Sequence, residues 1–163
     1  MVSKAVFIDR DDTIAKDVPY CDDPAKFEIY PFVPSAIARL NDAGYLVIVI
    51  TNQSGINRGY FTEETLSRIH ARMISDVESG GGHIDDVFFC PHAPDEKCGC
   101  RKPEIGMGLV AIEKYDIDPA QSYMVGDHDK DMEFGRRLGC KGCIKVGETF
   151  NFADAVDTIL GTD

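Results

Sequence analysis

The stretch Val6-Phe7-Ile8-Asp9-Arg10-Asp11-Asp12-Thr13-Ile14 decides the fold. Its apolar run ends at Asp9, and Asp11 adds a second carboxylate on the same side, because residues i and i+2 of an extended segment point the same way. Burying both charges without a metal or a cationic partner is costly. We therefore predict a strand over 5–9 that presents both carboxylates at the edge of a sheet. One could attack as a nucleophile while the other moves a proton; an exposed acidic turn is the alternative.

The composition is that of an ordinary globular protein. The chain has 163 residues, of which 44% are hydrophobic and 28% charged, and this length suits one domain over 1–163 with its own core. The net charge of −11 argues against a nucleic-acid or anionic-membrane surface. We find no apolar run of roughly 20 residues and no signal-peptide pattern, and so expect a cytoplasmic protein without a membrane partner. The sequence does not indicate the oligomeric state.

Strand-like and helix-like segments alternate along the chain. We predict strands over 5–9, 45–51, 86–90, 122–126 and 142–146. We predict helices over 34–43, 106–115, 129–138 and 152–160, and a longer one between a Thr62 cap and Gly80. This alternation predicts an α/β fold with a doubly wound parallel sheet of five strands and no large cap domain. Ligands of such sheets bind at the carboxyl ends of the strands.

Polar residues gather where the predicted strands end. They are Asp9 and Asp11, then Thr51, Asn52, Gln53 and Ser54, then Asp127 and Asp131, with Arg101 and Lys102 before the helix at 106. We expect all of them on one rim. Three carboxylates there suit a hard divalent cation, Mg²⁺ above all. A hydroxyl, an amide and a lysine suit the equatorial oxygens of a phosphate.

A second cluster has the spacing of a zinc site. Cys90, His92, Cys98 and Cys100 match a tetrahedral structural Zn²⁺ centre. A Cys₃His set leaves no open coordination position, so we expect the metal to staple this loop and to position Arg101 and Lys102. The alternative is one buried cysteine beside an exposed loop.

Four motifs in order resemble the haloacid dehalogenase superfamily of phosphohydrolases. They are D-x-D-x-T from Asp9, a hydrophobic strand with T-N-Q-S from Thr51, R-K-P from Arg101 and G-D-x-x-x-D from Gly126, and the resemblance covers the whole chain. It implies that Asp9 is the nucleophile that forms an aspartyl-phosphate and that Asp11 is the general acid/base. It also implies that Thr51 and Lys102 hold the transferring phosphoryl group.

The same resemblance implies the metal ligands. Asp9, the backbone carbonyl of Asp11 and Asp127 would bind Mg²⁺, with Asp131 as a supporting partner. Asp12 stands where the family usually has glycine, which would allow a positive φ. Because aspartate tolerates such conformations better than most residues, we interpret Asp12 as a tolerated variant. Asp12 is the only feature that supports a different class of function, a catalytically silent binding domain stapled by zinc.

A narrower resemblance concerns the substrate. The C-x-H, C-x-C and R-K-P motifs resemble the zinc-containing branch of the superfamily, which holds heptose bisphosphate phosphatases and histidinol-phosphate phosphatases. The loop over 51–59 and the run over 123–127 are similar to the heptose enzymes, whereas the short zinc loop is similar to the histidinol-phosphate enzymes. This implies a phosphorylated sugar as the substrate, D-glycero-D-manno-heptose 1,7-bisphosphate cleaved at C7 above all, with histidinol phosphate as the alternative.

The remaining polar residues are assigned with the same resemblance. Substrate contacts are expected from Tyr20, Asn52, Gln53, Ser54, Arg58, Arg101 and His128. His128 stands where the heptose enzymes have a lysine that is expected to touch phosphate. For Arg58 the sequence leaves two alternatives, a contact with a substrate phosphate and a solvated loop charge. We expect Cys140 and Cys143 to pack at a turn rather than to serve redox or metal chemistry. Cys21 is expected to be a loop thiol and His70 a solvated helix residue.

Overall fold

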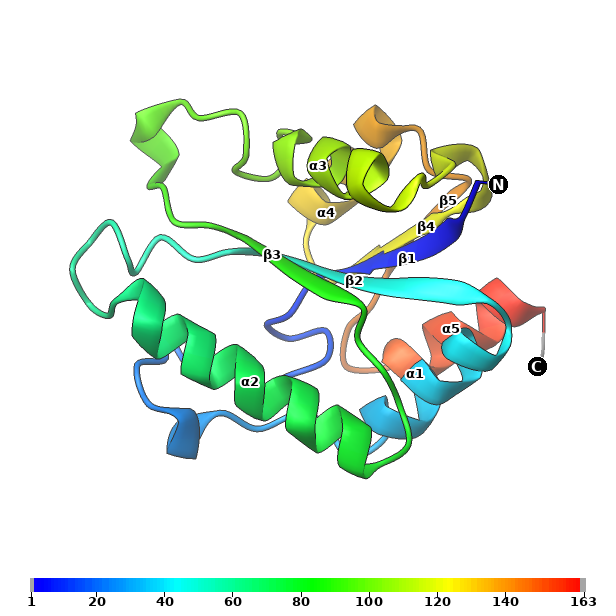
Figure 1. Ribbon diagram of the computed structural model, residues 1–163, viewed down its shortest axis with the longest axis horizontal. Coiled ribbons are helices and arrows are strands. Elements are labelled where there is room, and N and C mark those ends of the chain that lie inside the picture. Colours follow the sequence, from blue (N-terminus) through cyan, green and yellow to red (C-terminus); the bar gives the residue numbers. More distant parts are fainter. Residues whose placement is uncertain (1, 162–163) are drawn as a thin grey trace.

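A five-stranded parallel sheet in the order β3-β2-β1-β4-β5 lies between two layers of helices in the computed structural model, which describes residues 2–161 (Figure 1). The strands are β1 (Lys4–Ile8), β2 (Tyr45–Asn52), β3 (Asp86–Cys90), β4 (Tyr123–Gly126) and β5 (Gly142–Lys145). The helices are α1 (Val33–Asp42), α2 (Glu63–Ser79), α3 (Gly106–Tyr115), α4 (Asp129–Leu138) and α5 (Phe152–Leu160). The predicted doubly wound sheet is confirmed, with ends that differ by one residue in several elements.

The central strand β1 is buried on both faces, which explains its continuous apolar run. Val6 and Ile8 face the core formed with α1, α2 and α5, while Ala5 and Phe7 face the core formed with α3 and α4. Alternate side chains of a strand point to opposite faces, so one strand serves both cores. Burying a ring such as that of Phe7 contributes roughly 1.5–3 kcal/mol.

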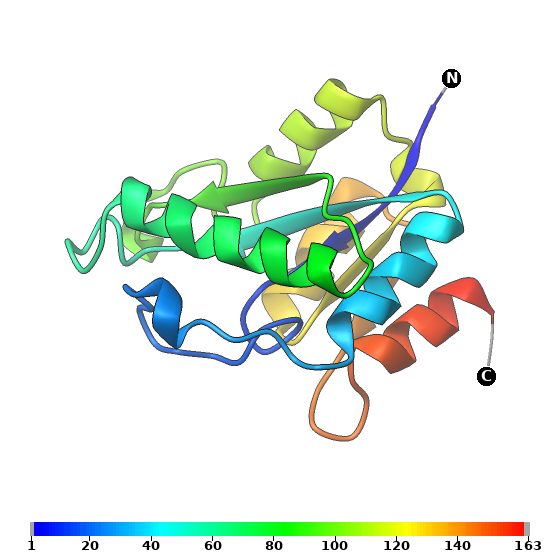
Figure 2. The same cartoon turned by 60° about the horizontal axis from the view of Figure 1, so that its bottom comes forward.

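The strand order reverses between β1 and β4, the position where ligands bind in such sheets. The loops that follow β1, β2 and β3 leave the sheet at this same end, on the left of Figure 1 and again in Figure 2. The fold therefore brings the predicted motifs to one edge. No helix among residues 2–161 is long and apolar enough to cross a membrane.

Two side chains differ from the sequence predictions. His70 was expected to be solvated, but it is 7% exposed and belongs to the buried face of α2, four residues after Leu66 and seven before Val77. Cys21 lies in a loop as expected, but its thiol is buried in the core because this loop folds back over the sheet. Cys140 and Cys143 pack against the α3–α4 core, and burial raises the pKa of Cys140 to about 12.

Candidate active site

Lys102 lies buried between two carboxylates, that of Asp9 just after β1 and that of Asp131 in the first turn of α4. Its ammonium donates to Asp9 Oδ1 at 2.7 Å, to Asp131 Oδ1 at 2.8 Å and to the Ile50 carbonyl at 2.9 Å. These contacts use all three donors of the ammonium. A lysine that is 3% exposed requires such partners, because an unpaired buried charge is strongly destabilising.

The charges of this cluster are not fully balanced by Lys102. Burial by itself lowers the pKa of Lys102, but Asp9 and Asp131 outweigh it and raise that pKa. Burial, followed by a hydrogen bond with Asp9 and the charges of Asp9 and Asp131, raises the pKa of Asp127 to about 8. Burial and Asp9 also raise the pKa of Asp131, against the effect of Lys102. An additional cation would let all three carboxylates ionise together.

The three carboxylates have the chemistry of a Mg²⁺ site. Asp9, Asp127 and Asp131 each offer an oxygen, and these oxygens lie within 4.8 Å of one another. Mg²⁺ prefers oxygen ligands and keeps several waters that a phosphate can replace. The side chain of Asp11 does not belong to this group, and its predicted contribution through the backbone carbonyl stays a prediction.

The turn from β4 into α4 explains the G-D-x-x-x-D spacing. A side chain on Gly126 would place its Cβ 2.3 Å from the Asp131 carboxylate, so only glycine allows this approach. His128 caps α4, and Asp131 in turn accepts a hydrogen bond from the His128 backbone N–H at 3.2 Å. The capping box thus holds Asp131 beside Lys102.

Asp11 lies next to the cluster but faces a different cavity. Its two oxygens accept hydrogen bonds from Arg10 Nε at 2.9 Å and Arg10 Nη2 at 3.2 Å, and Gln53 Nε2 lies 3.4 Å from Oδ2. Arg10, Asp11, Tyr20 and Gln53 are among the residues that line this cavity of about 300 Å³. Asp9 thus belongs to the carboxylate cluster, while Asp11 faces a neighbouring cavity that has room for a group beside it.

The last residues of β2 and the residue that follows it support the cluster. The buried Thr51 hydroxyl accepts a hydrogen bond from Gln53 Nε2 at 2.9 Å. Asn52 pairs with the backbone of Lys102, since its Oδ1 accepts from the Lys102 N–H at 3.0 Å and its Nδ2 donates to the Lys102 carbonyl at 3.3 Å. The structure thus places Asn52, predicted to contact substrate, where it orients Lys102.

Exposed aromatic and cationic side chains form the rim next to Asp11. The rings of Tyr20 and Tyr60 lie 4.6 Å apart, and the Arg58 guanidinium lies 5.8 Å from the centre of the Tyr20 ring. Arg58 Nε also lies 3.4 Å from the Ser54 hydroxyl. The structure therefore brings together the predicted contacts Tyr20, Ser54 and Arg58, and adds Tyr60, which the motifs did not indicate.

A second part of the rim is strongly cationic. Lys97, Arg101, Lys102 and Lys130 line a cavity of about 390 Å³. The His128 ring does not line this cavity; its Nδ1 accepts a hydrogen bond from the Lys130 N–H at 3.3 Å. The sequence motifs did not indicate Lys130, although it lies only two residues after His128, the position where the heptose enzymes have a lysine.

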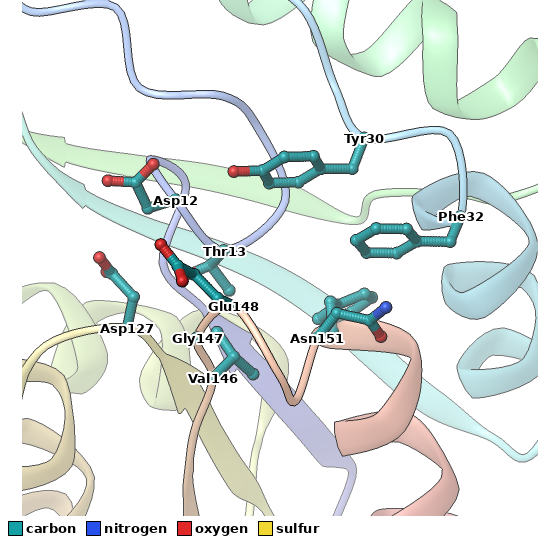
Figure 3. A pocket seen from close by; sticks show the side chains of 10 residues that line it. Asp12, Thr13, Tyr30, Phe32, Asp127, Val146, Gly147, Glu148 and Asn151 are labelled. Carbon is teal, nitrogen blue, oxygen red and sulfur yellow. The ribbon is translucent and has the colours of Figure 1, made fainter.

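The opposite side of the cluster is acidic. A cavity of about 600 Å³ has Asp12, Asp127 and Glu148 in its lining, together with Tyr30 and Phe32 (Figure 3). Asp12 has a φ of 60°, the conformation expected for a position where the family usually has glycine. Burial and the charges of Asp12 and Asp127 raise the pKa of Tyr30. A cation held by Asp127 would offset part of this charge, but Asp12 and Glu148 would still repel a second phosphate, so the cationic rim suits that group better.

The predicted zinc ligands converge at the end of β3. Cys90 Sγ lies 3.4 Å from His92 Nδ1 and 3.5 Å from Cys98 Sγ, while Cys100 Sγ lies 3.2 Å from His92 Nδ1 and 3.6 Å from Cys98 Sγ. Four ligands about 2.0–2.3 Å from a tetrahedral centre lie roughly 3.3–3.8 Å from one another. The donor set and its spacing therefore fit Zn²⁺.

The surroundings favour a thiolate at Cys98, the form that binds metals. Burial opposes ionisation, but hydrogen bonds from backbone N–H groups, including that of Arg101 at 3.3 Å, lower the pKa of Cys98 to about 6. Arg101 Nη1 also donates to the His92 carbonyl at 3.1 Å. The cluster is thus bonded directly to the segment that continues into Lys102.

Comparisons with known proteins agree with this geometry. A HAD-hydrolase-like family model matches residues 99–149. The chain is 43% identical over 136 residues to a probable D-glycero-D-manno-heptose-1,7-bisphosphate 7-phosphatase of Thermoplasma volcanium, covering 83% of this chain and 93% of the relative. It is 41% identical over 153 residues to the D-glycero-beta-D-manno-heptose-1,7-bisphosphate 7-phosphatase of Haemophilus ducreyi, covering 90% and 84%.

A solved structure is also closely similar. The D,D-heptose 1,7-bisphosphate phosphatase of B. bronchiseptica, complexed with magnesium and phosphate, superposes with a TM-score of 0.87 at 32% identity, covering 97% of this chain and 98% of that one. The likeness extends over nearly the whole of both proteins. The chain therefore belongs to the haloacid dehalogenase-like phosphatases, in the D-glycero-D-manno-heptose-1,7-bisphosphate 7-phosphatase family.

Proposed function

We propose that this protein is a Mg²⁺-dependent phosphatase that hydrolyses D-glycero-D-manno-heptose 1,7-bisphosphate at its C7 phosphate. The observation that carries the proposal is the Asp9–Lys102–Asp131 contact next to Asp127, in a chain of this family. A carboxylate attacks a phosphate monoester only where cations offset the repulsion between two anions. Lys102 supplies one such cation in direct contact with Asp9.

The proposed reaction gives one role to each aspartate of the D-x-D motif. A carboxylate oxygen of Asp9 attacks phosphorus, the bond from phosphorus to the C7 oxygen breaks, and Asp11 protonates that oxygen as it leaves. Asp11 then takes a proton from a water that attacks the aspartyl-phosphate, which releases inorganic phosphate and restores Asp9. Thr51 and Lys102 would hold the phosphoryl oxygens during both steps, and Lys102 would exchange one of its three present contacts for a phosphoryl oxygen.

Two metals fit the two clusters. Asp9, Asp127 and the Asp11 carbonyl would hold Mg²⁺, supported by Asp131, and the ion would supply electrostatic stabilisation of the transferring phosphoryl group. Cys90, His92, Cys98 and Cys100 would hold a structural Zn²⁺. The short distances among Asp9, Asp127 and Asp131, and among the four Cys/His ligands, support these assignments, whereas the Asp11 carbonyl rests on the family resemblance alone.

The choice of a bisphosphate is supported by the charge of the rim. Arg101 and Lys130 line the cavity on the Lys102 side, and Arg58 lies beside Tyr20 on the Asp11 side. These cations can pair with a second phosphate, whereas the acidic side near Asp12 and Glu148 cannot. The rim therefore favours a substrate with two anionic groups. That the protein is a single domain over 1–163, and that it is cytoplasmic, remain predictions from the sequence.

A panel of phosphate esters tests the proposal. Phosphate release is measured with Mg²⁺ for both anomers of the heptose bisphosphate, the matching heptose monophosphate and histidinol phosphate. We expect the highest kcat/KM for a heptose bisphosphate and no turnover after Mg²⁺ is removed. Tenfold more efficient hydrolysis of histidinol phosphate would replace this assignment by the other member of the branch.

A further inference from the structure

Arg10 lies between the two aspartates of the D-x-D motif and has the largest fully buried side chain among the described residues. Its Nε and Nη2 hold the two oxygens of Asp11, and its Nη1 lies 3.1 Å from Nε2 of His70 on α2. The guanidinium also lies over the Phe27 ring, 5.4 Å from its centre. Arg10 thus connects His70, sixty positions away in the chain, to Asp11.

The chemistry of arginine determines the state of His70. A guanidinium offers only donors, so His70 Nε2 must accept, which makes the ring neutral with its proton on Nδ1. Burial and the charge of Arg10 lower the pKa of His70 to about 3. The neutral His70 ring holds the far end of the guanidinium without forming an ion pair with it. The ion pair of Arg10 is therefore made with Asp11.

Asp11 is held on one side and open on the other. Its side chain is 31% exposed, against 2% for Arg10, and it lines the cavity of about 300 Å³. The backbone on either side is also fixed, since the Arg10 carbonyl accepts from the N–H groups of Ile14 and Ala15 at 3.0 Å. Among the described residues, Asp11 Oδ1 accepts only from Arg10 Nε, whereas Oδ2 accepts from Arg10 Nη2 and Gln53 Nε2, so Oδ1 keeps a lone pair for the cavity side.

We propose that Arg10 and His70 are positioning residues, which together aim the Asp11 carboxylate at the leaving-group oxygen. The proposal rests on the acid/base role of Asp11 under the proposed function. A bidentate Arg–carboxylate pair sets both the distance and the plane of the carboxylate. His70 keeps the guanidinium from rotating away from that plane, and so acts on Asp11 through Arg10.

A positioning role differs from a structural one in its dependence on the leaving group. Protonation matters for a basic alkoxide and little for a nitrophenolate, which leaves without a proton. Loss of fold stability, by contrast, lowers the activity toward both substrates by the same factor. The ratio of the two losses therefore separates the two roles.

The experiment compares His70→Leu, which removes the acceptor, with His70→Gln, whose amide oxygen can reach Arg10. The substrates are para-nitrophenyl phosphate and the alkyl phosphate that the wild-type chain hydrolyses fastest. We expect His70→Leu to lower kcat about 10-fold for the alkyl ester and less than about 3-fold for the aryl ester, as misplacement of a catalytic group does. His70→Gln should recover most of the loss. His83→Leu, at an exposed histidine, is the matched control.

Arg10→Lys extends the series, because an ammonium cannot make the bidentate contact. We expect a loss of roughly 100-fold for the alkyl ester and less than about 10-fold for the aryl ester. If this variant does not fold, which circular dichroism would reveal, the two His70 variants decide. Equal losses on both esters, no loss in His70→Leu, or no recovery in His70→Gln would overturn the proposal.

Asp11→Asn, assayed in parallel, keeps the proposal separate from the proposed function. If Asp11→Asn itself loses activity equally on both esters, the acid role of Asp11 is wrong. If Asp11→Asn depends on the leaving group and the His70 variants do not, only the positioning role fails. Because the alkyl ester is chosen by activity, neither result depends on the heptose assignment.

Discussion

The two clusters of candidate metal ligands are built in opposite ways. In the zinc cluster, four ligand atoms face one another at 3.2–3.6 Å and leave no place for a further ligand. In the carboxylate cluster, Lys102 satisfies Asp9 and Asp131, while the pKa of Asp127 is raised to about 8 because burial and Asp9 leave it without a balancing charge. A closed set of ligands stabilises a loop, whereas an unbalanced set can bind a metal and a phosphate.

The two clusters are also connected. The candidate zinc ligand Cys100 is followed directly by Arg101 and Lys102, and the Lys102 backbone is held by Asn52 at the end of β2. The closed cluster thus fixes the segment that places an ammonium inside the open one. Substitutions in the carboxylate cluster should abolish turnover. Substitutions in the zinc cluster should displace Lys102.

The largest effect is expected from Asp9→Asn, which keeps the shape of the side chain and removes the attacking charge. We expect kcat to fall by roughly 10³-fold or more, as when a covalent nucleophile is deleted. Phosphate release from the heptose bisphosphate measures it, with Asp22→Asn at an exposed loop position as the control. More than a tenth of wild-type turnover in Asp9→Asn would contradict the role.

The closed cluster is tested by Cys98→Ala. Purified wild-type protein should contain about one zinc per chain, as expected for a four-ligand site, and still require added Mg²⁺. Cys98→Ala should lose the zinc and most of the activity, whereas Cys140→Ala, outside the cluster, should retain both. Elemental analysis and turnover measure this difference. Wild-type protein that is fully active without zinc would show that the cluster does not position Lys102.

The exposed rim should matter less than either cluster. Arg101→Ala and Arg58→Ala should reduce the preference for a bisphosphate over the matching monophosphate by about 1–3 kcal/mol, the range for a charged hydrogen bond. The ratio of kcat/KM values for the two substrates measures it. Arg68→Ala, which removes an exposed ion pair with Glu64 on α2, should leave the ratio unchanged. An unchanged ratio in both rim variants would place the second phosphate elsewhere.

The smallest effect concerns His70, which belongs to neither cluster. Its folded-state pKa of about 3 lies below the unfolded value of 6.5, so the unfolded chain takes up the proton first as the pH falls. The stability contributed by the neutral ring is complete above pH 6.5 and is lost toward pH 3. Between pH 7 and pH 6 this amounts to less than about 1 kcal/mol.

Urea unfolding of wild type and His70→Gln at both pH values measures this difference. Glutamine does not titrate, so the wild type should lose more of its free energy of unfolding than the variant, by less than about 1 kcal/mol. The zinc and Mg²⁺ content must be the same in both proteins, so that the difference in stability comes from His70 and not from loss of metal. Equal losses would mean that His70 is not buried as a neutral ring.

Contacts within short segments were predictable, and contacts between distant segments were not. The strand before Asp9 and the four zinc ligands from Cys90 to Cys100 follow from local spacing and periodicity. Lys102 was expected near the phosphate, but its place between Asp9 and Asp131 joins positions 93 and 29 residues apart. The two contacts of Asn52 with the Lys102 backbone have no local signal either, and its contact with substrate stays a prediction.

The sequence by itself determined the parallel sheet and the two ligand clusters, because apolar period, motif spacing and ligand chemistry are local properties of the chain. Only the tertiary structure decided that His70 is buried against Arg10, that Asp11 faces its own cavity, and that the two sides of the site carry opposite charge. The physical reason is that burial and electrostatic environment depend on which surfaces the folded loops bring together, and these surfaces come from segments far apart in the chain.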